Sequence, residues 1–282
     1  MSAEGTMSGV MEITVLGCGS SGGVPRADGD WGACDPADPR NRRSRCSLLV
    51  QRQATAGASE QGPAHATTVL IDTAPDFQSQ AAAAGVKRID AVLFTHDHAD
   101  QTHGIDDLRA FAIRARRRTP CHMDAATHET LIRRFGYIFR GQGAYPAICE
   151  DHLIPAHGQA WSVDGPSGAI PIVSFDQDHG LGVHSVGYRL GPVAYSSDVV
   201  ELSAEAFEAL RGVKVWIVDA LRYTPHPTHS HLERTLDWIA RVKPERAILT
   251  NMHIDLDFAT LAAQLPPGVE PAFDGLRFTV DL

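Results

Sequence analysis

Short apolar runs alternate with polar or glycine-rich segments along the chain. Compact apolar runs predict buried strands, whereas apolar residues spaced three or four apart predict helices. We expect strands at 13–16, 47–50, 68–71, 91–94, near Cys121, and at 170–175, 183–189, 193–196, 215–218, 247–249 and 276–280. We expect helices through 81–84, at 105–117, from Thr127 onward, and at 204–210, 232–242 and 258–265. This mixture predicts the α/β class.

Turn residues place several boundaries between these elements. Asp76 is expected to cap the helix that runs through 81–84, and Gly85 is expected to end it. The polar segment 52–66 is expected to be the mobile loop of a hairpin. The stretch 136–146 is rich in Gly and Tyr and contains a Pro, so we expect irregular structure there.

The composition is that of a globular protein. With 282 residues and 43% hydrophobic content the chain can bury a full core, and we predict a disordered segment at 1–10 followed by one domain at 11–282. The net charge of −9 argues against a surface that binds nucleic acid or anionic membrane, because both need a positive field. The beginning of the chain has no signal-peptide pattern and no apolar run reaches membrane-spanning length, so we expect a cytoplasmic protein.

The densest group of chemically active residues directly follows the expected strand 91–94. It contains His96, His98, Asp100 and His103. Two imidazoles on alternate residues of an extended segment can point to one side and bind one cation, and a carboxylate two residues further reaches a neighbouring position. The cluster therefore predicts a metal site at the carboxyl end of a strand, where ligands collect in α/β sheets. The competing interpretation is a solvated turn that is rich in histidine.

Three later residues also follow apolar runs, namely His179, Asp198 and His253. Each one alone is more often a turn residue or a surface histidine, but their common position at strand ends favours one shared site. His96, His98 and His179 would form a three-nitrogen site that suits zinc-like ions.

The whole donor set suits two divalent ions, for which we expect zinc or manganese. Asp100 and His253 would hold the second ion, and Asp198 would bridge the two. Two ions about 3.5 to 4 Å apart can activate a bridging water and stabilise an oxyanion. Hydrolysis of a phosphodiester or an acyl bond needs both effects.

This arrangement resembles the motif of metallo-β-lactamase-fold hydrolases, which is His-x-His-x-Asp-His followed by distant His, Asp and His. The resemblance covers nearly the whole chain and implies a single-domain αββα sandwich with the metals at one edge. Four segments resemble the branch of the phosphoribosyl 1,2-cyclic phosphate phosphodiesterases of phosphonate degradation. They are Leu16 to Pro25, Asn41 to Ser47, His103 to Arg109 and Pro225 to His229. The branch also resembles tRNA 3′-end processing nucleases, which share the dinuclear core.

One motif position departs from the family. The fourth motif ligand is His in the family and Gln101 in this chain, and an amide oxygen is a weaker, neutral ligand. The second site is therefore expected to be weakened, and to hold manganese or iron, to fill only with substrate present, or to stay empty. His103 lies two residues further, about 200° around a helix, so we expect it to face elsewhere.

The cysteines depart from the phosphodiesterase branch as well. The enzyme resembled here carries a cysteine-held zinc, but the five cysteines of this chain are scattered and odd in number. We interpret Cys18, Cys34 and Cys46 as buried small hydrophobic residues in a reducing compartment. Cys149 and His152 are interpreted as loop residues.

Four further residues are candidates for direct or supporting roles. His229 precedes the expected helix 232–242 and matches the histidine beside the scissile phosphate in the related phosphodiesterases, so it is the candidate general acid; the alternative is a helix cap. Arg109 and Arg222 are candidate phosphate ligands or structural ion pairs. Asp72 is expected to accept a ligand imidazole N–H, or to be a turn residue.

Two segments have structural explanations. The glycines of 17–22 match a dinucleotide fingerprint in spacing, but Pro25 and a polar loop follow where the helix should begin, so no nucleotide cofactor is expected. The basic run 41–45 is expected to be a solvated face, with attraction of an anionic substrate as the alternative.

We therefore predict a metal-dependent phosphodiesterase for a small phosphate ester, cyclic esters included. A metal-bound hydroxide would attack phosphorus, His229 would protonate the leaving oxygen, and Asp100 would belong to the catalytic group. The expected partner is this small-molecule substrate, with neither membrane nor nucleic acid, and a homodimer stays open. The alternatives are a thioester or lactone hydrolase of the same fold, or a weakly catalytic metal-binding or sensing protein in which Gln101 has removed the second ion.

Overall fold

Two seven-stranded sheets form the centre of the computed structural model, which describes residues 9–53 and 65–282. The strand orders of the described residues are β14-β1-β2-β3-β4-β5-β6 and β13-β12-β11-β10-β9-β8-β7. Nearly all of the predicted disordered segment 1–10 and most of the predicted mobile loop 52–66 lie outside the described residues. Val10 already belongs to the first strand.

The first sheet is antiparallel on one side and parallel on the other. Its strands are β14 (Arg277–Asp281), β1 (Val10–Gly17), β2 (Ser47–Gln53), β3 (Thr67–Ile71), β4 (Ala91–Leu93), β5 (Thr119–Met123) and β6 (Cys149–Leu153). Pairing is antiparallel from β14 to β3 and parallel from β3 to β6. The predicted hairpin is therefore the antiparallel pair β2 and β3.

The second sheet has the same mixture of pairings. Its strands are β13 (Val269–Pro271), β12 (Arg246–Thr250), β11 (Val215–Asp219), β10 (Val193–Ser196), β9 (His184–Leu190), β8 (Ile170–Asp178) and β7 (Ala160–Val163). Pairing is antiparallel from β7 to β10 and parallel from β10 to β13.

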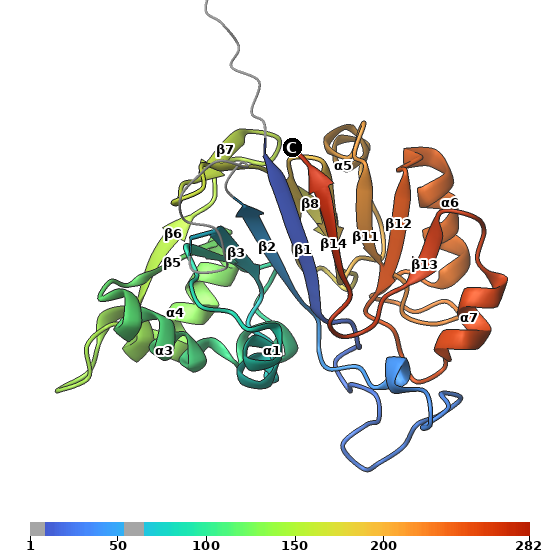
Figure 1. The fold of residues 1–282 in the computed structure, drawn as a ribbon, viewed down its shortest axis with the longest axis horizontal. Helices are drawn as coiled ribbons and strands as arrows, with labels where there is room; N and C mark the ends of the chain where they lie inside the picture. Colours follow the sequence, from blue (N-terminus) through green and yellow to red (C-terminus); the bar gives the residue numbers. More distant parts are fainter. Residues whose placement is uncertain (1–8, 54–64) are drawn as a thin grey trace, which may run out of the picture.

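Helices cover the outer faces of both sheets, which confirms the predicted αββα sandwich (Figure 1). The first sheet carries α1 (Phe77–Ala84), α3 (Leu108–Ala115) and α4 (Ala125–Arg140), and the second carries α5 (Ala204–Ala209), α6 (Leu232–Val242) and α7 (Phe258–Gln264). The short helix α2 (Ala99–Thr102) and the 3₁₀ turns η1 (Pro39–Asn41) and η2 (Ile105–Asp107) complete the helical elements of the described residues.

Burial on both faces explains why the strand sequences are continuous apolar runs. In β2, Leu48 and Val50 point into the core between the sheets, whereas Leu49 packs with the helices outside the first sheet. In β3, Leu70 likewise faces the helices. A strand covered on both sides has no polar face, so it shows no apolar-polar alternation.

Three strands were not predicted, because edge strands need little apolar sequence. β6, where Cys149 and His152 were interpreted as loop residues, is an edge strand in which only Cys149 is buried; β7 and β13 are the edges of the second sheet. The predicted helix 105–117 is divided into η2 and α3, and α4 continues to Arg140, into the stretch predicted to be irregular.

Asp76 does not cap α1 with its side chain. Its carboxylate instead accepts the backbone N–H of Arg45 at 2.9 Å and forms an ion pair with the Arg45 side chain, also at 2.9 Å. Gly85 ends α1 as predicted, with the left-handed φ of 66° that glycine adopts without steric cost.

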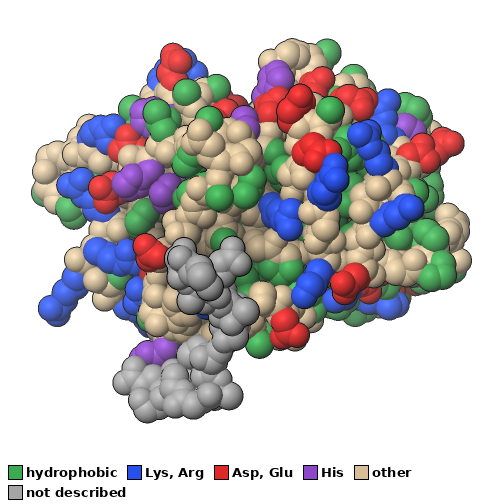
Figure 2. All heavy atoms as spheres, turned by 90° about the horizontal axis from the view of Figure 1, so that it is seen from above, with side chains coloured by type: hydrophobic (Ala, Val, Ile, Leu, Met, Phe, Trp, Pro, Cys, Tyr) green, Lys and Arg blue, Asp and Glu red, His purple; other side chains and the backbone are tan. Residues whose placement is uncertain are grey.

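The surface shows no single-signed field on the face that Figure 2 presents, the end of the molecule that carries the C-terminus. Acidic and basic side chains are interspersed there. Among the described residues, every helix is too short or too polar to cross a membrane.

Asp257 gives a test of how the segment before β2 is attached to the second sheet. One carboxylate oxygen caps α7 through the Thr260 N–H at 2.9 Å, and the other accepts from Asp35 N–H at 3.1 Å and from the Asn41 side chain at 2.7 Å. We expect Asp257→Ala to lower the free energy of unfolding by about 2 kcal/mol, because a cap and a tether are lost together. Urea unfolding followed by circular dichroism measures it.

Ser203→Ala is the matched control, because Ser203 caps α5 and its described hydrogen bond serves the helix alone. We expect a loss of about 1 kcal/mol there. Equal losses in the two variants would contradict the tethering role of Asp257.

Candidate metal centre

Loops from both sheets converge at one edge of the sandwich. His96 follows β4, and His98 lies at the N-terminus of α2. His179 follows β8 and Asp198 follows β10, so the second sheet supplies the opposite side. The site thus stands where strands end, because the sheet interiors are filled with apolar side chains.

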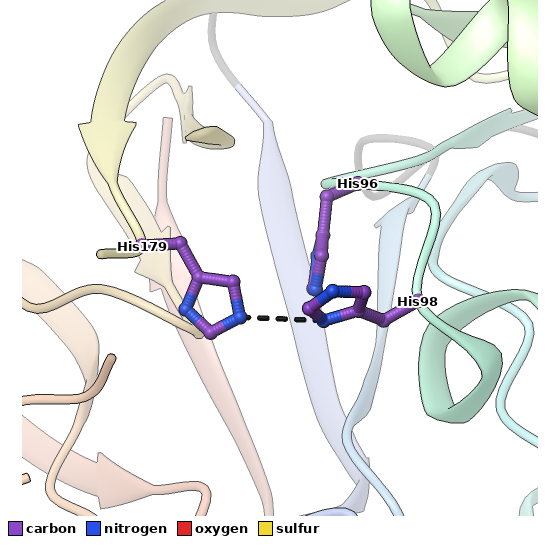
Figure 3. A group of neighbouring side chains, drawn as sticks. All are labelled: His96, His98 and His179. Carbon is purple, nitrogen blue, oxygen red and sulfur yellow. Dashed lines mark hydrogen bonds between the residues drawn. The ribbon is translucent and has the colours of Figure 1, made fainter. Parts of the chain in front are cut away.

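Three imidazoles point toward one another, with His96 and His98 on one side and His179 on the other (Figure 3). Each offers a nitrogen, and the three nitrogens lie within 4.8 Å of one another. The Nε2 atom of His179 is 3.3 Å from Nδ1 of His98. Such a group of nitrogens suits a divalent ion such as zinc.

The hydrogen bonds of these histidines leave lone pairs for an ion. Nδ1 of His96 lies 3.0 Å from the Thr95 hydroxyl, while its Nε2 is buried and has no hydrogen-bond partner in the structure. Nδ1 of His179 lies 2.7 Å from the carbonyl oxygen of Thr228, to which it donates, so Nε2 carries the lone pair. A buried imidazole nitrogen without a partner is costly unless an ion binds it, so these residues fit one metal ion.

Burial also keeps these rings in the form that binds metal. It lowers the pKa of His96 to about 3, and it lowers the pKa of His179 as well. Both rings are therefore neutral at neutral pH, as a metal ligand must be.

Asp72 acts through Thr95 and not directly on an imidazole. Its carboxylate accepts the Thr95 hydroxyl at 2.9 Å, and this fixes the Thr95 oxygen as the acceptor for His96 Nδ1–H. The predicted direct contact with an imidazole N–H is therefore wrong, whereas the turn alternative fits, since Asp72 follows β3 at a left-handed φ of 60°. Asp tolerates this left-handed conformation better than most residues.

His229 and Asp219 form a buried pair beside the three histidines. Nδ1 of His229 donates to Asp219 at 2.9 Å, and the His229 ring centroid is 4.8 Å from that of His179. His229 is not the cap of α6, because His231 holds that position. His179, Asp198 and His229 form a second group with ligand atoms within 4.8 Å.

Electrostatics favour a charged His229. Burial alone would lower its pKa, but the carboxylates of Asp219 and Asp198 raise the pKa to about 9. Burial raises the pKa of Asp219 to about 6. Sequence reasoning missed Asp219, although it ends the apolar run of β11 just as Asp198 follows that of β10.

Asp100 and Gln101 lie on α2, where the amide nitrogen of Gln101 faces two carboxylates. It is 3.3 Å from Asp100 Oδ2 and 3.2 Å from Asp198 Oδ2. The predicted ligand atom, the amide oxygen, is buried and has no hydrogen-bond partner. Asn251 places a second amide nitrogen 3.3 Å from Asp198 Oδ1.

His253 stands apart from the three histidines. Its Nε2 contacts the guanidinium group of Arg26, and its Nδ1 is 3.2 Å from Asp255. Neither of the two candidate metal-binding groups found among the described residues includes His253. The residues predicted for a second ion therefore do not fit one as they stand.

The other candidates lie in structural interactions. Arg109 forms an ion pair with Asp106 at 2.6 Å, and Arg222 donates to the carbonyl oxygens of Thr224 and Pro225 in the turn before His229. The ring of His103 makes a T-shaped contact with that of Phe135, and His103 belongs to neither candidate metal-binding group. Phosphate binding by either arginine stays a prediction.

The remaining sequence candidates are buried. All five cysteines are free and buried. In the basic run 41–45, predicted to be a solvated face, Arg43 is only 1% exposed and binds the Leu256 carbonyl oxygen at 2.7 Å. That part of the run is structural.

The family model of the "Beta-lactamase superfamily domain" matches residues 67–254. The chain belongs to this family. Together with the sandwich, the match confirms the metallo-β-lactamase fold, which is a fold of metal-dependent hydrolases.

Known proteins of this fold resemble the chain to different degrees. A crystal structure of "a New Diphosphatase from the PhnP Family" has 33% identity and a TM-score of 0.83, and the match covers 98% of this chain and 99% of that one. Zinc-bound PqqB from Methylobacterium extorquens has 16% identity and a TM-score of 0.68 over 96% of this chain and 100% of its own. The latter likeness shows the fold alone.

A curated relative carries a different name. The octanoyltransferase of Porphyromonas gingivalis is 29% identical over 96% of this chain. The match covers 52% of that protein, so the chain spans about half the length of this relative.

Zinc titration tests the three-histidine group. We expect chelator-stripped protein to bind zinc, and His96→Ala to lower the affinity by more than about 100-fold, because outer partners alone account for about 10- to 100-fold. Thr95→Val, which removes the link from Asp72 to His96, should lower it by about 10- to 100-fold. A competing fluorescent chelator measures both affinities.

His184→Ala is the control, because His184 is exposed and contacts Asp176 on β8. It should leave zinc affinity unchanged. Wild-type affinity in a folded His96→Ala variant would show that the ion binds elsewhere.

Proposed function

We propose that the protein is a metal-dependent phosphodiesterase that hydrolyses a small phosphate ester. The observation that carries this proposal is the His229–Asp219 pair, which places a proton donor beside His179 at the three-histidine group. Hydrolysis of a phosphodiester needs an activated water and a proton for the leaving oxygen, and the two groups serve these two needs.

His96, His98 and His179 would hold a divalent ion, which would supply Lewis acidity for activating water and offsetting charge on a phosphoryl oxygen. The protein side chains do the rest. Asp219 holds the imidazole of His229 by Nδ1, so Nε2 is the nitrogen that faces a substrate oxygen. Asp198 adds negative charge 3.9 Å from the ring and favours the protonated form. His229 thus delivers its proton to the departing alkoxide.

A cavity of about 590 Å³ beside Asp100 supports a small, anionic substrate. Arg26 and Arg45 line it, together with Ser21 and Gly22 of the glycine-rich segment, and Asp28 and Asp100 are its acidic lining residues. Guanidinium groups bind phosphate oxygens in pairs of parallel hydrogen bonds. The net charge of −9 disfavours a long polyanion such as nucleic acid.

The resemblance to a diphosphatase over nearly the whole of both chains also supports phosphate ester chemistry. The octanoyltransferase relative favours a second candidate, hydrolysis or transfer of an acyl group. The match covers only about half of that protein, so we rank the acyl substrate second.

Add-back of metals tests the proposal. Chelator-stripped protein should not hydrolyse bis(p-nitrophenyl) phosphate, and zinc or manganese should restore cleavage, because the Lewis acid is required. Absorbance of p-nitrophenolate measures the rate. A thioester and a lactone are tested in parallel. If either is hydrolysed and the phosphodiester is not hydrolysed with any metal, the acyl candidate replaces the phosphodiesterase.

The leaving group tests the role of His229. We expect His229→Ala to lower kcat by about 10²- to 10⁴-fold on an alkyl phosphodiester, because an alkoxide needs a proton to depart. The loss should shrink to about 10-fold or less on bis(p-nitrophenyl) phosphate, whose phenolate departs without one. Zinc content is measured in parallel, since His229 lies near the ion.

His231→Ala serves as the matched variant, because His231 belongs to the same turn and its described role is the N-terminal position of α6. We expect His231→Ala to retain the wild-type kcat on both the alkyl phosphodiester and bis(p-nitrophenyl) phosphate. Equal losses of His229→Ala on good and poor leaving groups would contradict general acid catalysis by His229.

A further inference from the structure

The family motif provides places for two ions, yet this chain fills the second place with its own donor groups. A second ion would need Asp100, Asp198, His253 and the motif position held by Gln101. Among these, both carboxylates and His253 are already engaged by nitrogen donors. We propose that the protein works with one ion, and that the Gln101 amide and the Arg26 guanidinium replace the second.

Gln101 is fully buried, and its amide nitrogen bridges Asp100 and Asp198 at 3.3 and 3.2 Å. The two carboxylates determine its orientation, because they accept hydrogen bonds and would repel the amide oxygen. In this orientation the N–H groups point to the place between the carboxylates where an ion would stand. The amide therefore offsets part of their charge and blocks that place.

Asp198 would have to bridge two ions, and both of its oxygens are occupied. Oδ2 accepts from Gln101, and Oδ1 accepts from Asn251 at 3.3 Å. The side chain is 3% exposed, so water does not easily replace these donors. Asp198 retains lone pairs for one neighbouring ion, but the amides hold it on both sides.

Arg26 occupies the ligand nitrogen of His253. Its guanidinium contacts Nε2, and because a guanidinium group only donates, this contact uses the Nε2 lone pair that an ion would need. A permanent positive charge at that nitrogen repels a cation. Arg26 also lines the cavity with Asp100, so the charge sits on the side from which a substrate enters.

The guanidinium group of Arg26 places a positive charge where a second ion would place one, and this charge belongs to the protein itself. A guanidinium group can hold a phosphoryl oxygen with two hydrogen bonds, which this inference takes over from the proposed function. Arg26 directly follows the glycine-rich segment 17–25, and Ser21 and Gly22 of this segment line the same cavity as Arg26.

Metal counting decides between one ion and two. The full chain is stripped with chelator, loaded with excess zinc or, separately, manganese, desalted, and its bound metal is measured by mass spectrometry against protein concentration. We expect one ion per chain in the wild type. We expect two in the double variant Arg26→Ala with Gln101→His, because the competing charge is gone and the motif ligand is present.

The matched control makes the same two chemical changes at exposed positions, Arg42→Ala with Gln142→His, and should bind one ion. Two ions in the wild type would overturn the inference, as would one ion in a folded Arg26→Ala, Gln101→His variant. If that variant fails to fold, anomalous scattering from crystals of the metal-loaded wild type tests the inference instead. A peak between Asp100, Asp198 and His253 would refute it, and a peak at the three-histidine group alone would support it.

The count does not depend on turnover, so it is separate from the proposed function. One ion without phosphodiester cleavage would refute the function and keep the inference, and two ions with cleavage would do the reverse. If the wild type cleaves the phosphodiester, Arg26→Ala should lower kcat/KM by about 10- to 100-fold, and Arg26→Lys should lower it by less. Both single variants should still bind one ion per chain. An unchanged kcat/KM would remove Arg26 from the substrate contact.

Discussion

Charge compensation at a buried sheet edge is the constraint on which the rest of the site depends. Asp100, Asp198 and Asp219 lie close together with little or no exposure to water. Ionised carboxylates in such a place need donors or cations, since water no longer solvates them. Each one has a donor: the Gln101 amide for Asp100, two amides for Asp198, and the His229 imidazole for Asp219.

The three histidines obey the opposite requirement. A histidine needs to be neutral to bind an ion, and for His96 and His179 burial provides this by making the imidazolium form unfavourable. The same burial would lower the pKa of His229, but the two carboxylates beside it reverse the direction. One small region thus holds imidazoles in two protonation states, which separates a metal-binding group from a proton-donating pair.

The sandwich makes this separation possible because its strands are packed on both faces. Apolar side chains fill the space between the sheets and below the helices, so polar residues gather where the strands end. Asp198 and Asn251 turn the chain sharply there, with left-handed φ values of 55° and 58°. Their side chains consequently meet over the site, even though they follow different strands.

The sequence by itself determined the α/β class, most of the strands and helices, and the grouping of His96, His98 and His179 as a candidate site. These features are local or follow a strong pattern, since apolar runs report burial and alternate histidines report a shared direction. Tertiary structure decided the rest. Edge strands such as β6 contain few apolar residues, so no apolar run reveals them. The roles of Asp219 and Arg26 depend on contacts with His229 and His253, which lie elsewhere in the chain. The direction of the Gln101 amide is likewise set by two carboxylates, one of which is 97 positions away, and no local pattern contains that information.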